Sequence, residues 1–112
     1  MLGDNLRQLY ESSQEHWIDM WFSEYEKNIR EACMESIQKL GKKSCELSIT
    51  YCYFHCPSDM SGEDVINTIE NYLINKQGFT TATLNFVYWD DVACKDVYTS
   101  DITNELLIYL EW

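Results

Sequence analysis

The chain has 112 residues and a net charge of −11, and 46% of its residues are apolar. This length fits one domain, residues 1–112, and the apolar content sets the chain apart from disordered acidic segments. With 19 acidic residues against 8 basic ones, direct binding to DNA or RNA and adhesion to an anionic membrane are both disfavoured.

The first 40 residues predict one long helix, about 4–40, because this stretch contains no Pro and Gly41 follows its end. Apolar residues at 3.6-residue spacing are expected to face the core. They are Ile18, Trp21, Phe22, Tyr25, Ile29, Ala32, Cys33 and Leu40.

Other apolar residues near the start of this helix point elsewhere. Leu2, Leu6, Leu9, Trp17 and Met20 project about 120–180° away from the core stripe at 100° per residue. Two alternatives follow. Either the helix breaks near residues 12–13 and its first part folds back on the core, or the helix is straight and carries a second apolar face that needs a partner.

The stretch Cys45–Phe54 predicts a strand, because it is rich in β-branched and aromatic residues that alternate. Ser61, followed by Glu63 and Asp64, has the pattern of a helix N-cap, and a second helix is expected to reach about Lys76. Its predicted core stripe is Val65, Ile66, Ile69, Tyr72 and Leu73.

Two more strands are predicted, Phe79–Trp89 and Glu105–Trp112. The segment between them, Asp90–Thr103, is predicted to be a long acidic loop. The order is α-β-α-β-β, with a β-α-β-β unit over about 44–112. We therefore expect an α+β fold in which two helices pack on one face of a three-stranded mixed sheet. The first two strands would be parallel, with a right-handed connection.

The other face of that sheet would carry an apolar patch. Such a patch commonly marks an interaction site, and a homodimer is the simplest occupant. The alternative is that the acidic loop covers the patch with Val92, Val97 or Tyr98. The residues expected to support self-association are Leu2, Leu6, Leu9, Trp17, Met20, Phe54, Val87, Trp89 and Tyr109.

Acidic side chains gather on the first helix and in the loop. Carboxylates on a rigid scaffold can imitate phosphates and compete for a basic groove, whereas the simpler interpretation is that they keep the domain soluble. The residues expected to bind a partner are Glu24, Glu31, Glu35, Asp90, Asp91, Asp96 and Asp101.

A metal site and an enzymatic site are both disfavoured. Cys52, His55 and Cys56 could bind zinc only if a turn at Pro57 brought them together with Cys45 or Cys94, and ordinary buried thiols are the simpler interpretation. No nucleophile, phosphate-loop or calcium-loop motif is present. We expect no cofactor and no catalytic residue.

The spacing of the cysteines and the pattern of the first residues predict the cellular compartment of the protein. Five cysteines at irregular spacing do not match a secreted disulfide framework. The first residues lack a basic region followed by a long apolar run, so no signal peptide is predicted, and no apolar run reaches the roughly 18 residues of a membrane helix. These features predict a cytoplasmic protein with free thiols.

The segments NIREACMESIQKLGKKSCELSITY, DVINTIENYLINKQGF and ELLIYLEW, in the order α-β-α-β-β, resemble small accessory proteins of tailed bacteriophages. The resemblance implies a phage product in the cytoplasm of its host. Such products often bind and block a host protein, as acidic anti-CRISPR and DNA-mimic inhibitors do. It supplies no functional residue, because the match consists of pattern alone.

Overall fold

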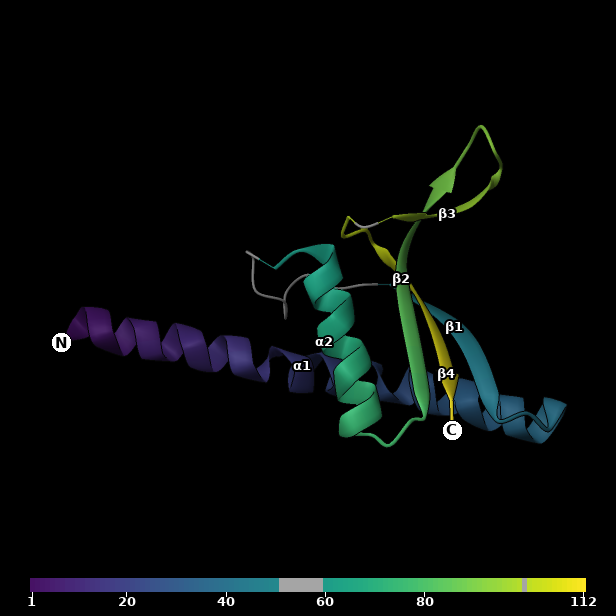
Figure 1. Ribbon diagram of the computed structural model, residues 1–112, viewed down its shortest axis with the longest axis horizontal. Helices are drawn as coiled ribbons and strands as arrows, with labels where there is room; N and C mark the ends of the chain where they lie inside the picture. Colours follow the sequence, from purple (N-terminus) through teal and green to yellow (C-terminus); the bar gives the residue numbers. More distant parts are fainter. Residues whose placement is uncertain (51–59, 100) are drawn as a thin grey trace.

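The computed structural model describes residues 1–50, 60–99 and 101–112, and only the backbone of residues 11–16. A long helix comes first and is followed by an α+β body (Figure 1). The elements are α1 (Leu2–Glu35), the π-helical turn η1 (Ser36–Leu40), β1 (Ser44–Thr50), α2 (Gly62–Asn75), β2 (Thr81–Asp90), β3 (Lys95–Thr99) and β4 (Glu105–Glu111).

The sheet has four strands in the order β1-β4-β2-β3, and every neighbouring pair is antiparallel. The predicted three-stranded mixed sheet is therefore wrong in its detail, although the α+β class is confirmed. Strands β1 and β2 do run in the same direction, because both are antiparallel to β4. They are not neighbours, because β4 lies between them.

The prediction that Asp90–Thr103 is a loop is wrong, because this segment contains strand β3. Asp90 Oδ1 accepts hydrogen bonds from the backbone N–H groups of Val92 and Ala93, and Cys94 adopts a left-handed conformation with φ 53°. These two features close a tight turn, which sends Lys95–Thr99 back along β2 as a hairpin. Val92, at the tip of this hairpin, is fully exposed and covers no part of the sheet.

Both helices cover the same face of the sheet, as expected. Alternate strand residues pack with residues of α1 and α2 in one hydrophobic core. Helix α1 lies over β1, whereas α2 lies over β2. The residues exposed to 2% or less in this core are Trp21, Val65, Ile69, Leu73, Leu84, Phe86, Leu106, Ile108 and Leu110.

Trp17 belongs to this core too, with 4% of its surface exposed, so its assignment to a second apolar face is wrong. Trp17, Trp21, Tyr25 and Ile29 are four residues apart and all are buried. Such a row is inclined to the helix axis, because each step of four residues turns about 40° around the helix. The prediction used one average direction for the whole core stripe, so it placed Trp17, the first residue of the row, outside the stripe.

Of the two alternatives for the first helix, the structure has the continuous one. Helix α1 runs through Ser12 and Ser13 without interruption, and its first turns extend beyond the body (Figure 1). The π-helical turn η1 then changes the phase of the helix before Gly41 ends it with a φ of 61°. Leu40, predicted to face the core, is consequently 64% exposed.

Candidate functional site

The sheet face turned away from the helices is called the open face here. Residues that pair directly across antiparallel strands share one face. Buried Cys45, Leu84 and Leu106 face the helices, so their neighbours along each strand point to the open face. In register, the open face consists of Ser44, Glu46, Ser48, Thr50, Glu105, Leu107, Tyr109, Glu111, Thr81, Thr83, Asn85, Val87, Trp89, Asp96 and Tyr98.

The open face combines negative charge with exposed aromatic rings. It carries four carboxylates, Glu46, Asp96, Glu105 and Glu111, and no Lys or Arg occupies any of its described positions. Glu105 accepts a hydrogen bond from Ser48 at 2.8 Å, and Glu111 accepts one from the Tyr109 hydroxyl. These contacts hold two of the carboxylates in place on the sheet.

The apolar part of this face lies at the β2–β3 end. Trp89 and Tyr98 are 58% and 63% exposed there, whereas Tyr109 is half-buried and lies away from this end, on β4 opposite Thr83. Val87, which was expected to be part of an exposed patch, is 2% exposed and lies in register between Tyr98 and Glu105. The prediction of an exposed Val87 is therefore wrong, because β3 was not foreseen. Phe54 lies outside the described residues.

The predicted acidic residues of α1 are exposed, but two of them have basic neighbours. Glu31 lies 3.9 Å from Lys27, and Glu35 lies 3.1 Å from Lys39. Each is an i,i+4 pair on the helix surface, where such pairs contribute about 0.3–0.5 kcal/mol. The neighbouring cations reduce the field that Glu31 and Glu35 present to a partner. Glu24 is exposed on the same helix.

The four predicted acidic residues between Asp90, the last residue of β2, and Asp101 do not form one surface. Asp90 caps the hairpin turn, and Asp91 lies in that turn. Asp96 pairs with Trp89 on the open face, while Asp101 lies beyond β3 and donates its backbone N–H to Thr99. Of these four, the fold brings only Asp96 onto the open face.

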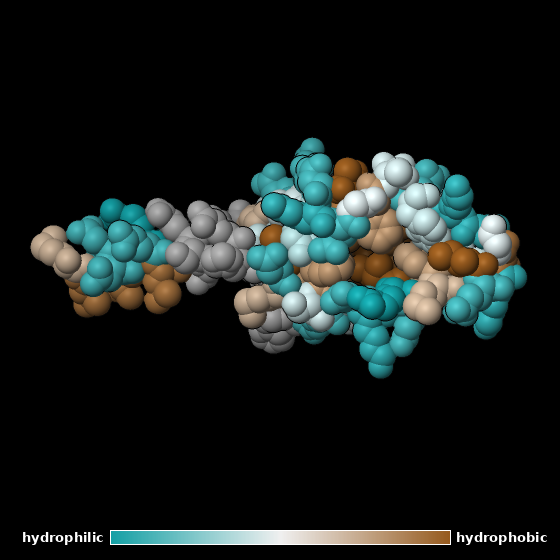
Figure 2. Space-filling model, turned by 90° about the horizontal axis from the view of Figure 1, so that it is seen from below, coloured by the Kyte–Doolittle hydropathy of each residue, from teal (hydrophilic) through white to brown (hydrophobic). Residues whose placement is uncertain are grey.

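The predicted self-association residues of α1 other than Trp17 are exposed. Leu2, Leu6, Leu9 and Met20 each keep more than half of their surface in contact with solvent. Figure 2 shows hydrophobic surface along one side of the N-terminal end of α1 and again on the body, between hydrophilic side chains.

The cysteines do not form a metal site within the described part of the chain. Among those residues, no three His, Cys, Asp or Glu side chains converge on one point. Cys45 is buried and Cys94 is exposed in the hairpin turn, whereas Cys52, His55 and Cys56 lie outside the described residues. Cys45 instead has Cys33 beside it, with the two Sγ atoms 3.4 Å apart.

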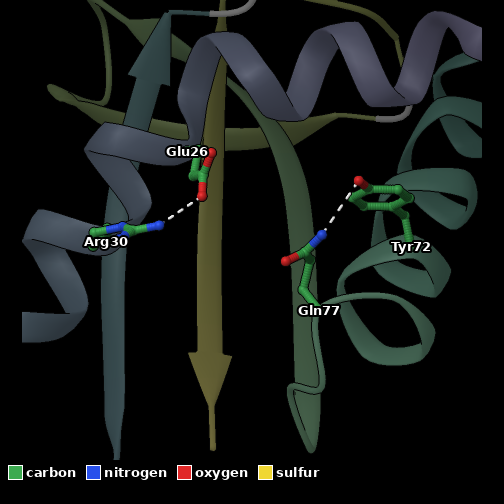
Figure 3. Close-up of polar contacts among 4 residues, drawn as sticks. All are labelled: Glu26, Arg30, Tyr72 and Gln77. Atoms are coloured by element: carbon green, nitrogen blue, oxygen red, sulfur yellow. Dashed lines mark hydrogen bonds and ion pairs between the residues drawn. The ribbon is translucent and has the colours of Figure 1, made fainter.

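A groove of about 300 Å³ lies on the helix side, between α1 and the segment that joins α2 to β2. Its polar lining consists of Glu26, Arg30 and Gln77. Arg30 pairs with Glu26 at 2.6 Å, and Gln77 donates a hydrogen bond to the Tyr72 hydroxyl at 3.3 Å (Figure 3). Its apolar lining consists of Phe22, Ile29, Cys33, Met34, Ile37, Phe79 and Trp112.

Alkaline pH is expected to destabilise the fold. Burial raises the pKa of Cys33 from 9.0 to about 12 and also raises the pKa of Cys45 and Tyr72. The hydrogen bond to Glu111 raises the pKa of Tyr109. Because these groups hold their protons more tightly when folded, their contribution to stability is complete below pH 9 and is lost as the pH rises toward 12.

Urea unfolding at pH 7, 9, 10 and 11 measures this effect. The free energy of unfolding should fall steadily above pH 9, and Tyr109→Phe should make that fall shallower. A free energy that stays level from pH 9 to 11 would contradict the prediction.

Sequence reasoning missed Glu46 and Glu105 as site residues. Glu46 follows buried Cys45, and Glu105 precedes buried Leu106. Because successive strand residues point to opposite faces, this alternation was the signal that could have placed both carboxylates on the open face. The pairing of Asp96 and Tyr98 with β2 had no such local signal. It depends on the hairpin, which brings β3 beside β2.

No family model matches the chain, and no curated protein or solved structure shows significant similarity to it. Within the described residues, no helix has both the length and the apolar character needed to cross a membrane.

Proposed function

We propose that this chain is a non-enzymatic binding module whose open face docks onto a basic surface of a partner protein. One observation carries the proposal: four carboxylates and no described cation share a sheet face with exposed Trp89 and Tyr98. Aromatic side chains are frequent anchors of protein interfaces, and complementary charge steers the encounter and fixes the partner.

The kind of partner follows from the charge. A basic surface that also binds nucleic acid fits an acidic face of this kind, since both ligands are polyanions. Together with the phage resemblance, this favours an inhibitor that acts in the cytoplasm of a host cell, in the manner of anti-CRISPR and DNA-mimic proteins. The open face is favoured over α1, because Glu31 and Glu35 already have Lys27 and Lys39 beside them.

Binding to a panel of purified host nucleases and polymerases tests the proposal, with a duplex DNA as competitor. A binder should have an affinity that falls at least tenfold between 50 and 300 mM salt, because salt screens exposed charges. Glu46→Lys with Asp96→Lys should weaken binding by a further tenfold or more, and duplex DNA should displace the protein.

The matched control is Glu31→Lys with Glu35→Lys, which makes the same change of charge on α1. It should alter the affinity by no more than about threefold through long-range charge. If the helix variant weakened binding and the open-face variant did not, the site would lie on α1 and the assignment to the open face would be wrong. Binding that ignored salt and both variants would overturn the electrostatic proposal itself.

A further inference from the structure

The solvent side of α1 carries a second feature, independent of the open face. Six exposed apolar side chains follow one heptad register, with alternating steps of three and four residues. Each keeps between 48% and 73% of its surface exposed. Five of them lie on α1, namely Leu2, Leu6, Leu9, Met20 and Met34, and the sixth is Ile37 at the start of η1.

The distribution of these residues along the register is uneven. Leu2, Leu6 and Leu9 form one apolar end, and Met34 and Ile37 form the other, which also lines the groove. Between them, the register positions Ser23, Lys27 and Arg30 are polar. A two-fold axis across the middle of the helix would therefore superpose the apolar end of one copy on the opposite apolar end of another.

We propose that α1 pairs antiparallel with α1 of a second copy, so that Leu6 and Leu9 of each chain cover Met34, Ile37 and the groove of the other. Leu2, Leu6 and Leu9 are spaced i, i+4, i+7, which is among the anchor spacings of a helix that fills an apolar groove. Within one chain the leucines cannot reach this groove, because the rigid helix α1 separates the two.

The length of α1 favours a second copy as the occupant, and the charge of the two bodies favours the antiparallel arrangement. Helix α1 is about 50 Å long at 1.5 Å per residue, and four of every seven positions of such a seam give about 20 contact residues per chain, as in a standard interface. Each copy carries a net charge of −11. An antiparallel pair keeps the two bodies at opposite ends, whereas a parallel pair would bring both acidic bodies together.

Sedimentation velocity of the full chain at 5–100 µM tests this proposal. The wild type should be a dimer that becomes tighter in 500 mM salt, because screening reduces repulsion between the two acidic chains. Leu6→Glu with Leu9→Glu should weaken the dimer at least tenfold, since the introduced carboxylates would be desolvated. Met34→Lys with Ile37→Lys should do the same.

Mixing the two double variants decides the geometry. An antiparallel heterodimer places introduced carboxylates against introduced ammonium groups at one end and native apolar residues at the other, so the mixture should recover dimer. Val92→Glu, on the exposed hairpin tip, should leave the dimer unchanged.

A monomeric wild type would overturn the proposal. A dimer that is weakened by the leucine substitutions but unchanged by the Met34 and Ile37 substitutions would also overturn it, since the leucines would then pair with each other. Circular dichroism checks that each variant is folded. The salt dependence distinguishes this proposal from the proposed function, because added salt should strengthen the dimer but weaken docking through the open face.

Discussion

Replacing Trp21 with alanine is expected to lower the free energy of unfolding by about 3–5 kcal/mol, the usual loss for a large aromatic side chain in a core. Trp21 has 0% of its surface exposed, and its ring lies 5.3 Å from that of Tyr25. It joins α1 to the sheet, so its loss would leave a cavity between the two layers. Small domains have only about 5–15 kcal/mol of stability, so this variant should be close to unfolding at 37 °C.

Replacing Trp21 with phenylalanine distinguishes the effect of the ring volume on stability from the effect of the indole N–H group. The Nε1–H group of Trp21 is buried and finds no acceptor among the described residues. An unpaired buried donor costs about 1–3 kcal/mol, so removing it offsets part of the loss of volume. Trp21→Phe should therefore be destabilised by about 2 kcal/mol or less.

Urea unfolding followed by circular dichroism measures all of these variants, because the signal does not depend on tryptophan fluorescence. Trp89→Ala is the matched control, since Trp89 is 58% exposed on the open face and should change stability by about 1 kcal/mol at most. Equal losses for Trp21→Phe and Trp21→Ala would mean that the indole N–H is paired and stabilising. A negligible loss for both would contradict the described core.

The elements with local signals were predicted well from the sequence. Ser61 caps α2 as expected, accepting a hydrogen bond from the backbone N–H of Asp64 at 3.2 Å. The alternation of Leu47 and Ile49 with Ser48 placed β1 correctly relative to the helices, and the same held for Leu106 and Ile108 in β4. Capping and alternation are properties of a few neighbouring residues, so the chain displays them directly.

The sheet order could not be predicted in this way. The position of β4 between β1 and β2 depends on contacts between residues about 60 positions apart, such as Leu47 with Ile108. β3 escaped prediction because Lys95–Thr99 is short and partly charged, and because the turn before it has a left-handed Cys94 where Gly or Asn is usual. Asp96 and Tyr98 reach the open face only because of this short strand and this turn.

Oxidation of Cys33 and Cys45 is expected to stabilise the protein by about 3 kcal/mol, the usual value for closing a short loop. The two Sγ atoms lie 3.4 Å apart and connect α1 to β1. With oxidised glutathione, one thiolate attacks the glutathione disulfide and releases a glutathione thiol. The second thiolate then displaces the other glutathione, and a disulfide forms as two protein hydrogens are lost.

This oxidation should be slow at neutral pH and accelerate as the pH rises. The thiolate is the attacking species, and burial raises the pKa of both Cys33 and Cys45 above 9.0, so the thiolate is scarce at pH 7. Exposed Cys94 should therefore acquire glutathione first. Raising the pH from 7 to 9 should increase the rate of the Cys33–Cys45 cross-link by about tenfold or more.

Peptide mapping by mass spectrometry identifies the cross-link, and urea unfolding of the oxidised and reduced protein measures its effect. Cys33→Ser should abolish both the cross-link and the gain in stability, whereas Cys94→Ser should affect neither. A cross-link to Cys52 or Cys56 in place of Cys33 would contradict the prediction. A Cys33–Cys45 cross-link that lowered stability would mean that α1 and β1 cannot approach by the remaining distance without strain, since a disulfide needs its sulfur atoms about 2.05 Å apart.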